Sequence, residues 1–218
     1  MTAYMELTLK ISKQEVTLLD TMGSDLSVVN AARVSFAKES EWELVNPADT
    51  IEYFFDGACN YGVKLSEKDQ KLISYLAKHN HWSPFAHTSL QFRIKAPIFV
   101  ARQLVKHQVG GVWNEVSRRY VDDEPEFYFP DVWRGKPENA KQGSSGELDP
   151  DTWVYVDSDV KRITQLCLEH YNFMIKVGTA PEQARMILPQ NTITEWYWTG
   201  SLAFFARVCK LRLDSHAQ

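Results

Sequence analysis

The order in which strand and helix patterns follow one another constrains the fold of this chain more than any other feature. Two short strand patterns precede residue 21, and a third run, at 88–96, alternates apolar and polar residues. Helical spacing of apolar residues recurs at 25–38, 66–79 and 157–178. Helix patterns outnumber strand patterns and do not alternate with them regularly, which favours an α+β fold over a doubly wound sheet.

Local signals predict where several helices begin and end. Asp25 is a possible N-cap of the first helix, and Ser66 starts a capping box with Asp69. A proline suits the first turn of a helix, so we expect one over Pro97–His107. Gly178 is expected to close the long helix that precedes it.

One stretch differs in composition from the rest of the chain. Residues 134–152, RGKPENAKQGSSGELDPDT, contain few apolar side chains and many Gly, Ser, Pro and charged residues, which predicts a surface loop. Neither flank looks complete alone, and 218 residues suit one sizeable domain. We therefore expect a single catalytic domain over residues 1–218, with this loop joining two of its parts.

Charge and cysteine content exclude several classes of protein. The net charge of −4 argues against a general nucleic-acid or membrane-surface binder. Cys59, Cys167 and Cys209 are widely spaced, so a zinc knuckle or a disulfide framework is not expected. The first residues do not resemble a signal peptide, and no run approaches transmembrane length. We expect a cytoplasmic protein, or one of the host cytoplasm if it is viral.

The polar stretch KHQVGGVWNEVSRRY, at 106–120, contains the densest group of candidate functional residues. Its glycine pair lets the backbone approach a ligand closely. Arg118 and Arg119 could hold a phosphate, with the hydroxyl of Ser117 beside them. The alternative is a solvated helix face in which Glu115 and Arg119 form an i,i+4 ion pair. The whole group favours an anionic, nucleotide-like ligand.

Two further clusters allow two interpretations each. HNHWSPFAH, at 79–87, offers three histidines as metal ligands, but it contains no acidic residue and no cysteine. Histidines at a helix end commonly cap carbonyls, so no metal site is expected. Near the end of the chain Arg207, Lys210 and Arg212 concentrate positive charge, which would also suit a solvated amphipathic terminus.

These three clusters, in this order, resemble the flavin-dependent thymidylate synthases. The family's signature is Arg-His-Arg, a gap, and then N-E-x-S-x-R-Y. NEVSRRY matches the second part, whereas KHQ keeps only His107 of the first, and eight residues separate Gln108 from Ser117, one more than is common. Further matches cover nearly the whole chain outside 134–152: AARVSF (31–36), HWSPFAH (81–87), KAPIFVARQ (95–103), EFYFP (126–130), ARMILP (184–189) and LRLDSHAQ (211–218).

The resemblance implies a fold, an assembly and a reaction. The fold is α+β, with mixed helices packed on a small, largely antiparallel sheet. The assembly is a homotetramer whose active sites lie between subunits, with no nucleic-acid or membrane partner. In the reaction FAD, reduced by NADPH, relays the methylene group of methylenetetrahydrofolate to carbon 5 of dUMP and supplies the hydride that gives dTMP.

The resemblance also assigns residues by position. The catalytic group would be Arg212, Ser117 and His107, with Arg212 polarising the uracil ring. The dUMP contacts would be Gln103, Glu115, Ser117, Arg118, Arg119, Arg185 and Arg212. The flavin contacts would be Ser35, His81, Ser83, Lys106, His107, Gln108, Glu115 and Arg207.

Some positions depart from the family's pattern around the flavin. An acidic residue of that site aligns with Ala86, and other flavin contacts align with Ser201 and Ala203. Lys106 offers a point charge where an arginine would offer a bidentate donor. Two alternatives therefore stay open: a flavin-dependent dUMP hydroxymethylase, and a non-catalytic nucleotide-binding relative.

Overall fold

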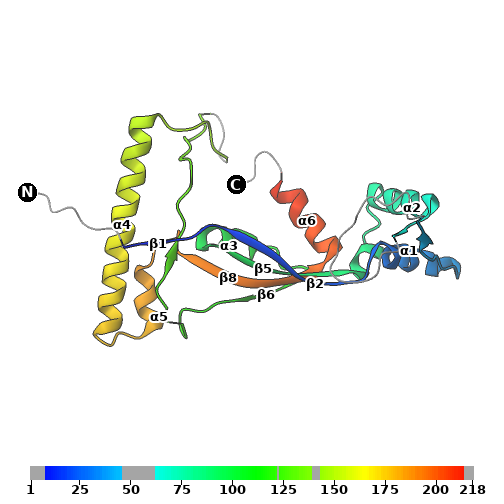
Figure 1. The fold of residues 1–218 in the computed structure, drawn as a ribbon, viewed down its shortest axis with the longest axis horizontal. Helices are drawn as coiled ribbons and strands as arrows, with labels where there is room; N and C mark the ends of the chain where they lie inside the picture. Colours follow the sequence, from blue (N-terminus) through cyan, green and yellow to red (C-terminus); the bar gives the residue numbers. More distant parts are fainter. Residues whose placement is uncertain (1–7, 46–61, 122, 139–142, 214–218) are drawn as a thin grey trace, which may run out of the picture. The chain divides into compact units, whose positions relative to one another are not determined.

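The computed structural model describes residues 8–45, 62–121, 123–138 and 143–213 (Figure 1). Internal contacts divide the chain into two compact units. Unit 1 comprises Met1–Leu18, Phe92–Trp198 and Val208–Gln218, and unit 2 comprises Leu19–Gln91 and Thr199–Arg207. The prediction of one domain over the whole chain stays a prediction.

The largest sheet has four strands in the order β2-β5-β8-β6 (Figure 1). The four strands are β2 (Glu15–Met22), β5 (Ser89–Pro97), β8 (Ile193–Ser201) and β6 (Gly111–Glu115). In unit 1 a short parallel pair, β1 (Lys10–Ile11) with β7 (Glu126–Phe127), lies outside this sheet. In unit 2 the antiparallel pair is β3 (Glu43–Leu44) with β4 (Val63–Lys64).

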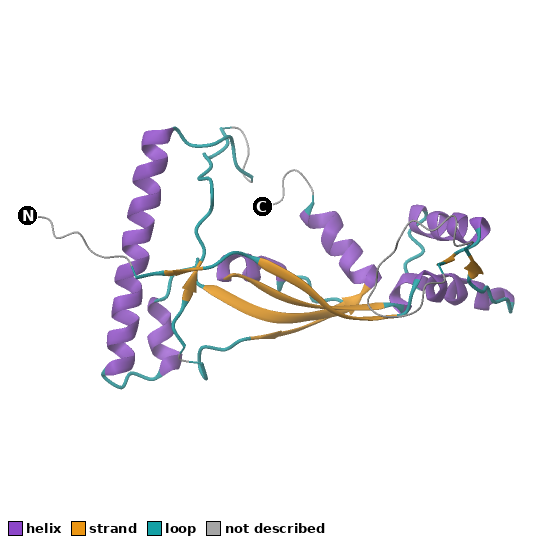
Figure 2. Cartoon of the chain, viewed as in Figure 1, coloured by secondary structure: helices purple, strands orange, loops and turns teal. Residues whose placement is uncertain are grey.

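Helices accompany these strands in both units (Figure 2). The helices of unit 1 are α3 (Ile98–Leu104), α4 (Pro150–Lys176), α5 (Pro181–Ala184) and the 3-10 turn η4 (Arg185–Ile187). Those of unit 2 are α1 (Asp25–Arg33), η1 (Val34–Phe36), α2 (Glu67–Lys78) and η3 (Pro84–His87), and α6 (Leu202–Arg212) follows β8. The predicted α+β class is confirmed. Among the described residues, no helix is both long and apolar enough to cross a membrane.

Aromatic and branched side chains form the core of each unit. The buried large side chains of unit 1 include Phe127, Leu168, Tyr171, Trp196 and Trp198. Those of unit 2 include Val28, Val29, Leu65, Leu76 and Phe204. Residues 192–209 therefore contribute to both cores. Alternate residues of the strand, Trp196 and Trp198, are buried in unit 1, and Phe204 on the helix is buried in unit 2.

Two predicted helix boundaries near the functional segments are wrong. Asp25 is the first residue of α1, and Ser24 is the N-cap. Pro97 is the last residue of β5 and the N-cap of α3, which ends at Leu104 rather than at His107. The helix stops there because the His107 N–H turns back to the Leu104 carbonyl at 3.0 Å, an i,i+3 bond typical of a helix end. Lys106 and His107 consequently lie in a turn.

The predicted loop at 134–152 ends three residues earlier than expected. Asp149 is the N-cap of α4, accepting a bond from the Thr152 N–H at 3.0 Å, and Pro150 occupies the first turn. The Asp-Pro pair thus starts the helix seven residues before the predicted start at 157. The described part of the loop is held by backbone bonds, among them Leu148 N–H to the Trp133 carbonyl at 3.0 Å. Gly178, with a φ of 87°, follows the helix as predicted.

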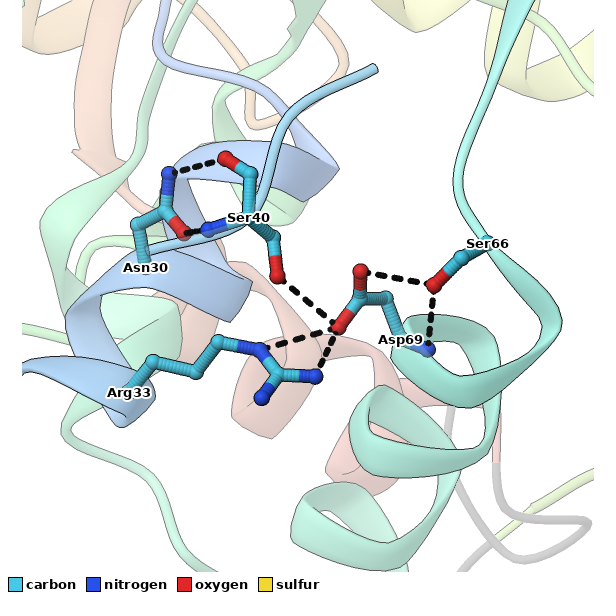
Figure 3. Close-up of polar contacts among 5 residues, drawn as sticks. All are labelled: Asn30, Arg33, Ser40, Ser66 and Asp69. Carbon is cyan, nitrogen blue, oxygen red and sulfur yellow. Dashed lines mark hydrogen bonds and ion pairs between the residues drawn. The ribbon is translucent and has the colours of Figure 1, made fainter. Parts of the chain in front are cut away.

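A buried carboxylate joins three segments of unit 2 (Figure 3). Asp69, at the start of α2, is 3% exposed and accepts bonds from Arg33 Nε at 3.0 Å and Ser40 Oγ at 3.2 Å. Ser66, the N-cap predicted from the sequence, donates its hydroxyl to Asp69 at 2.8 Å and accepts from the Asp69 N–H. Asn30 and Ser40 add a reciprocal pair of bonds.

These contacts decide the charge state of Asp69. Burial by itself raises the pKa of the carboxyl, but the bonds from Arg33, Ser66 and Ser40 outweigh that effect and the pKa is lowered. The ionised form is therefore the one that holds η1, the turn after Arg33, in place. Its contribution to stability is present above the unfolded pKa and is lost as the pH falls through the lowered folded value.

Asp69→Ala should destabilise the protein strongly, because it leaves the half-buried Arg33 without its carboxylate. Breaking a buried pair from one side commonly costs about 3–5 kcal/mol. The matched control is Asp159→Ala, which breaks the pair with Arg162, where the side chains are 56% and 36% exposed. It should cost at most about 1 kcal/mol. Denaturant unfolding of both variants checks this, and equal costs would contradict the role given to Asp69.

Candidate functional site

A pocket of about 560 Å³ in unit 1 gathers several of the predicted nucleotide contacts. We call it pocket 1. Its lining includes Glu115, Arg118 and Arg185 from the predicted set, together with Lys10, Lys95, Ile98, Val116, Val121, Asp123, Glu124, Glu126, Leu188, Ile193, Thr194 and Glu195. Residues from the end of β6, the turn after it, and η4 are thus brought together by the fold.

Glu115 is fixed at the end of β6 by both of its carboxylate oxygens. The indole N–H of Trp113 donates to Oε2 at 3.1 Å, and the hydroxyl of Thr194 on β8 donates to Oε1 at 2.7 Å. Glu115 lies in a strand, so the alternative of a helical ion pair with Arg119 is wrong. Neighbouring strand residues hold this carboxylate instead.

Trp113 is itself oriented by two buried tryptophans of β8. Its ring stacks on Trp196 with centroids 4.3 Å apart and meets Trp198 edge-on at 5.5 Å. Trp196 and Trp198 are 1% and 3% exposed. Offset and edge-to-face aromatic contacts restrict ring orientation, so the indole N–H is directed at Glu115 by the core itself.

The turn after β6 presents two arginines and a hydroxyl. Arg119 Nε donates to Ser117 Oγ at 3.0 Å, and its guanidinium lies 5.0 Å from the centroid of the Tyr120 ring. Arg118 donates through Nη1 to the Asp123 carbonyl at 2.8 Å. Arg185, in η4, donates through Nε to the Glu182 carbonyl at 3.2 Å. Each guanidinium has five donors, so these contacts orient the group and leave further donors for an anion.

Pocket 1 also contains an ion-pair triad, formed by Glu126, Lys10 and Lys95, that the sequence motifs do not predict. Glu126 accepts from Lys10 Nζ and Lys95 Nζ, each at 2.6 Å. Burial raises the pKa of Glu126, but the bonds from the two lysines outweigh it and lower the pKa to about 2. Lys95 and Glu126 each open a matched motif, KAPIFVARQ and EFYFP, whereas nothing in the sequence pointed to Lys10. Trp113 and Glu115 are two residues apart, so they lie on the same face of a strand. The sequence could indicate their contact only if residues 111–115 were predicted to be a strand.

A second pocket in unit 1, of about 720 Å³, contains two more of the predicted nucleotide contacts, whereas Ser117 and Arg119 line neither pocket. We call it pocket 2. Gln103 and Arg212 line it with Phe99, Val100, Leu104, Tyr128, Pro130, Asp131, Val132, Arg134, Gly143 and Ser144. The Phe99 and Tyr128 rings are 6.2 Å apart between centroids. The pocket therefore combines an aromatic wall with a fixed guanidinium.

Arg212, at the end of α6, is bonded to the segment after α3. Its Nε donates to His107 Nε2 at 2.9 Å, and its Nη2 donates to the Gln103 carbonyl at 3.2 Å. Burial, and then the positive charge of Arg212, lower the pKa of His107. A neutral imidazole has one acceptor nitrogen, and here that nitrogen faces the guanidinium.

The predicted flavin contacts divide between the units. Lys106, His107 and Gln108 lie in the turn between α3 and β6, in unit 1 with Glu115. Those in unit 2 are Ser35 in η1, His81 after α2, Ser83 before η3 and Arg207 on α6, and all four are exposed. Hydroxyl, imidazole and guanidinium donors suit the diphosphate and ring edges of a flavin dinucleotide, so these residues fit the group.

The three positions that depart from the family's pattern have identifiable surroundings. Ser201 Oγ accepts from the Phe204 N–H at 3.2 Å, which places the hydroxyl at the start of α6. Ala203 is buried, and Ala86 is exposed in η3. Two of the three side chains, Ser201 and Ala203, thus serve the fold of unit 2.

Two of the three histidines at 79–87, His79 and His81, take part in ring contacts. The Tyr75 ring lies 4.3 Å from His79 and 6.0 Å from His81, measured between centroids. Within the part of the chain that the structure describes, no group of three or more His, Cys, Asp or Glu side chains could hold a metal ion. The observed contacts are aromatic ones within unit 2.

Comparison with known proteins gives consistent matches over the chain. The family model described as thymidylate synthase complementing protein (Thy1) matches residues 17–218. A flavin-dependent thymidylate synthase of Thermosipho africanus is 34% identical, covering 95% of this chain and 81% of the relative. The one of Kosmotoga olearia is 35% identical, covering 95% and 80%.

Solved structures agree with the sequence relatives. The UMP/dUMP methylase PolB from Streptomyces cacaoi, bound with 5-Br dUMP, superposes with a TM-score of 0.75 at 32% identity, covering 96% of this chain and 86% of that one. The same protein bound with 5-Br UMP gives a TM-score of 0.73 at 29% identity, covering 94% and 79%.

The Glu126 triad should give the free energy of unfolding a distinct acid dependence. The folded pKa, about 2, is below the ordinary 4.5, so the unfolded chain binds more protons between these values and stability falls as the pH drops through them. The contribution is at most about 3 kcal/mol, and salt reduces it because a fifth of the side chain is exposed. Glu126→Gln should remove this part of the slope, measured by unfolding at several pH values.

Glu182→Gln is the matched control, because Glu182 is an exposed glutamate at the start of α5. This variant should keep the wild-type slope. An unchanged slope in Glu126→Gln would mean that the two lysines do not hold the carboxyl at a low pKa.

Proposed function

Because the chain belongs to the family of flavin-dependent thymidylate synthases, we propose that it converts dUMP to dTMP with methylenetetrahydrofolate as carbon donor and NADPH as the source of reducing equivalents. The enzyme is a methyltransferase. The observation that supports the substrate most directly is that two arginines, Arg118 and Arg185, line pocket 1 while the guanidinium of Arg212 is held in pocket 2. A nucleotide needs both, one for its phosphate and one for its base.

Pocket 1 suits the phosphate of dUMP. Arg118 and Arg185 line it, and Arg119 and Ser117 lie in the same turn as Arg118. Guanidinium groups bind phosphate oxygens through paired donors, and the serine hydroxyl adds one more. The carboxylate of Glu126 does not oppose the phosphate, because Lys10 and Lys95 neutralise it.

Pocket 2 suits the uracil ring. Arg212 donates to a carbonyl oxygen of the ring and stabilises the negative charge that develops there when carbon 5 becomes nucleophilic. The guanidinium is preorganised, since His107 and the Gln103 carbonyl already fix it. The Phe99 and Tyr128 rings offer an apolar surface for the base.

The two pockets have no lining residue in common. The family resemblance implies active sites shared between subunits, so we propose a nucleotide site that takes pocket 1 from one subunit and pocket 2 from another, as in a homotetramer. Exposed apolar side chains offer contact surface for such an assembly. Val16 and Met22 on β2 are 68% and 61% exposed, and Tyr155 and Phe173 on α4 are 71% and 57% exposed.

FAD is the proposed cofactor, and when bound and reduced it supplies the hydride and relays the one-carbon unit. The residues that would contact it, as the family resemblance implies, are Ser35, His81, Ser83, Arg207, Lys106, His107, Gln108 and Glu115. Arg207 and Lys106 contribute the positive charge that a dinucleotide diphosphate needs. Neither Cys167 nor Cys209 lines either pocket, so we assign no thiolate nucleophile to them.

The reaction is tested by supplying purified protein with dUMP, methylenetetrahydrofolate, NADPH and FAD and identifying the product by mass. We expect dTMP, and 5-hydroxymethyl-dUMP would favour the hydroxymethylase instead. Arg212→Ala should lower turnover by about 10²–10³, the usual cost of one preorganised donor. Two controls should stay within a few-fold of wild type: Lys210→Ala, which replaces an exposed lysine two residues before Arg212, and the double variant Cys167→Ala/Cys209→Ala. Turnover of Arg212→Ala near the wild-type rate would remove Arg212 from the reaction.

Site sharing is tested by complementation between two inactive variants. Arg185→Ala disables pocket 1 and Arg212→Ala disables pocket 2, so each homo-oligomer should be inactive. Co-expression should restore turnover to about a quarter of wild type, because random assembly leaves that fraction of shared sites with both pockets intact. No recovery in hetero-oligomers confirmed by mass would show that each subunit builds its site alone.

A further inference from the structure

We propose that His107 is a positioning residue whose neutral imidazole, as hydrogen-bond acceptor, fixes the guanidinium of Arg212 in pocket 2. The proposal rests on the proposed function, because it assumes that Arg212 meets the uracil ring. It assigns His107 a task separate from any contact of its own with substrate or flavin.

The geometry fixes the guanidinium at two of its nitrogens. His107 Nε2 accepts from Nε at 2.9 Å, and the Gln103 carbonyl accepts from Nη2 at 3.2 Å. A planar group bonded at two nitrogens along one edge cannot rotate about its Cδ–Nε bond without breaking a bond. The Nη1 amino group takes part in neither bond and is the donor pair that remains for a ligand.

Only the neutral imidazole can serve. Protonated histidine carries N–H on both ring nitrogens, which would place a donor and a positive charge against the Arg212 Nε–H. Burial and the charge of Arg212 both favour the neutral form, because both lower the pKa of His107. Since Nε2 accepts, the proton of the neutral ring is on Nδ1.

The surrounding charges leave Arg212 as the decisive neighbour. Lys106 precedes His107 in the same turn, and α6 brings Arg212 with the exposed Lys210 two residues before it. Asp131 and Arg134, which also line pocket 2, carry opposite charges. Among the described residues, Arg212 is the charged group that shifts the pKa of His107.

The local backbone fixes where the side chain of His107 starts. The His107 N–H is bonded to the Leu104 carbonyl at 3.0 Å, so the end of α3 sets where the imidazole begins. Lys106 and Gln108 form no such link to Arg212 among the contacts that the structure describes. This agrees with KHQ retaining only the middle residue of the family's tripeptide.

An acid limb in nucleotide binding follows from the sign of the pKa shift. Above the ordinary pKa of 6.5 the imidazole is neutral and holds Arg212, and as the pH falls through the lowered pKa it becomes a cation and repels Arg212. The affinity for dUMP should therefore decrease as the pH falls through the lowered pKa of His107. The phosphate of dUMP also titrates near pH 6, so only a comparison of variants isolates the part due to His107.

The decisive variant is His107→Gln, because the glutamine side-chain oxygen can accept from Arg212 and does not titrate. Calorimetry of the full chain with dUMP should measure the affinity at pH 7.5 and 5.5. At pH 7.5 the affinity of His107→Gln should be within a few-fold of wild type, and it should decrease less than that of wild type between pH 7.5 and 5.5. His107→Ala should weaken binding about tenfold at pH 7.5, the usual cost of losing a bond to a charged group. His170→Gln, which replaces an exposed histidine of α4, should keep the wild-type affinity and acid limb.

A second readout separates this proposal from the proposed function. Nitrogen NMR of the imidazole in the protein without nucleotide should show Nε2 unprotonated at pH 7.5, and Arg212→Ala should raise the pKa of His107. A protonated Nε2, or an undiminished acid limb in His107→Gln, would overturn the positioning role. Absence of dUMP binding by wild type, with Nε2 still accepting, would instead count against the proposed substrate.

Discussion

The start of β8 is the part of unit 1 on which the rest of the candidate site depends. Backbone N–H groups of three functional segments bond to it or to the residues just before it. Ile98 at the start of α3 donates to the Thr192 carbonyl, Val116 after β6 to Glu195, and Tyr128 after β7 to Asn191, each at 2.9 Å. A backbone amide left unpaired in the interior is costly, so these bonds fix where α3, the Ser117 turn and the β7 segment lie relative to one another.

Side chains of the same strand continue this arrangement into the site. The hydroxyl of Thr194 donates to one carboxylate oxygen of Glu115, and the indole N–H of Trp113 donates to the other. Trp196 and Trp198 orient that indole. Thr194, Trp196 and Trp198 are alternate residues of β8, so they share one face of the strand, and this face holds both Glu115 and Trp113. Polar groups held in this way lose little freedom when a ligand binds, which is what preorganisation means in energetic terms.

Compensated charge recurs around the candidate site and in unit 2. Glu126 is neutralised by Lys10 and Lys95 within pocket 1, and Asp69 by Arg33 in unit 2. Arg212 differs, because its fixed partners are a neutral imidazole and a carbonyl, neither of which cancels its charge. A guanidinium held by neutral acceptors keeps its full electrostatic effect on a bound ring, whereas one held by a carboxylate would lose much of it.

The sequence by itself determined the α+β class, the Ser66 cap of α2 and the family, because local patterning and ordered motifs are properties of short segments. It could not determine that α3 ends before His107 or that Glu115 lies in a strand, since tertiary hydrogen bonds outweighed the local helical spacing. Nor could it bring together Lys10 with Glu126, or Arg212 with His107. Those residues are over a hundred positions apart, and only the packing of α6 and the pairing of β1 with β7 place them in contact.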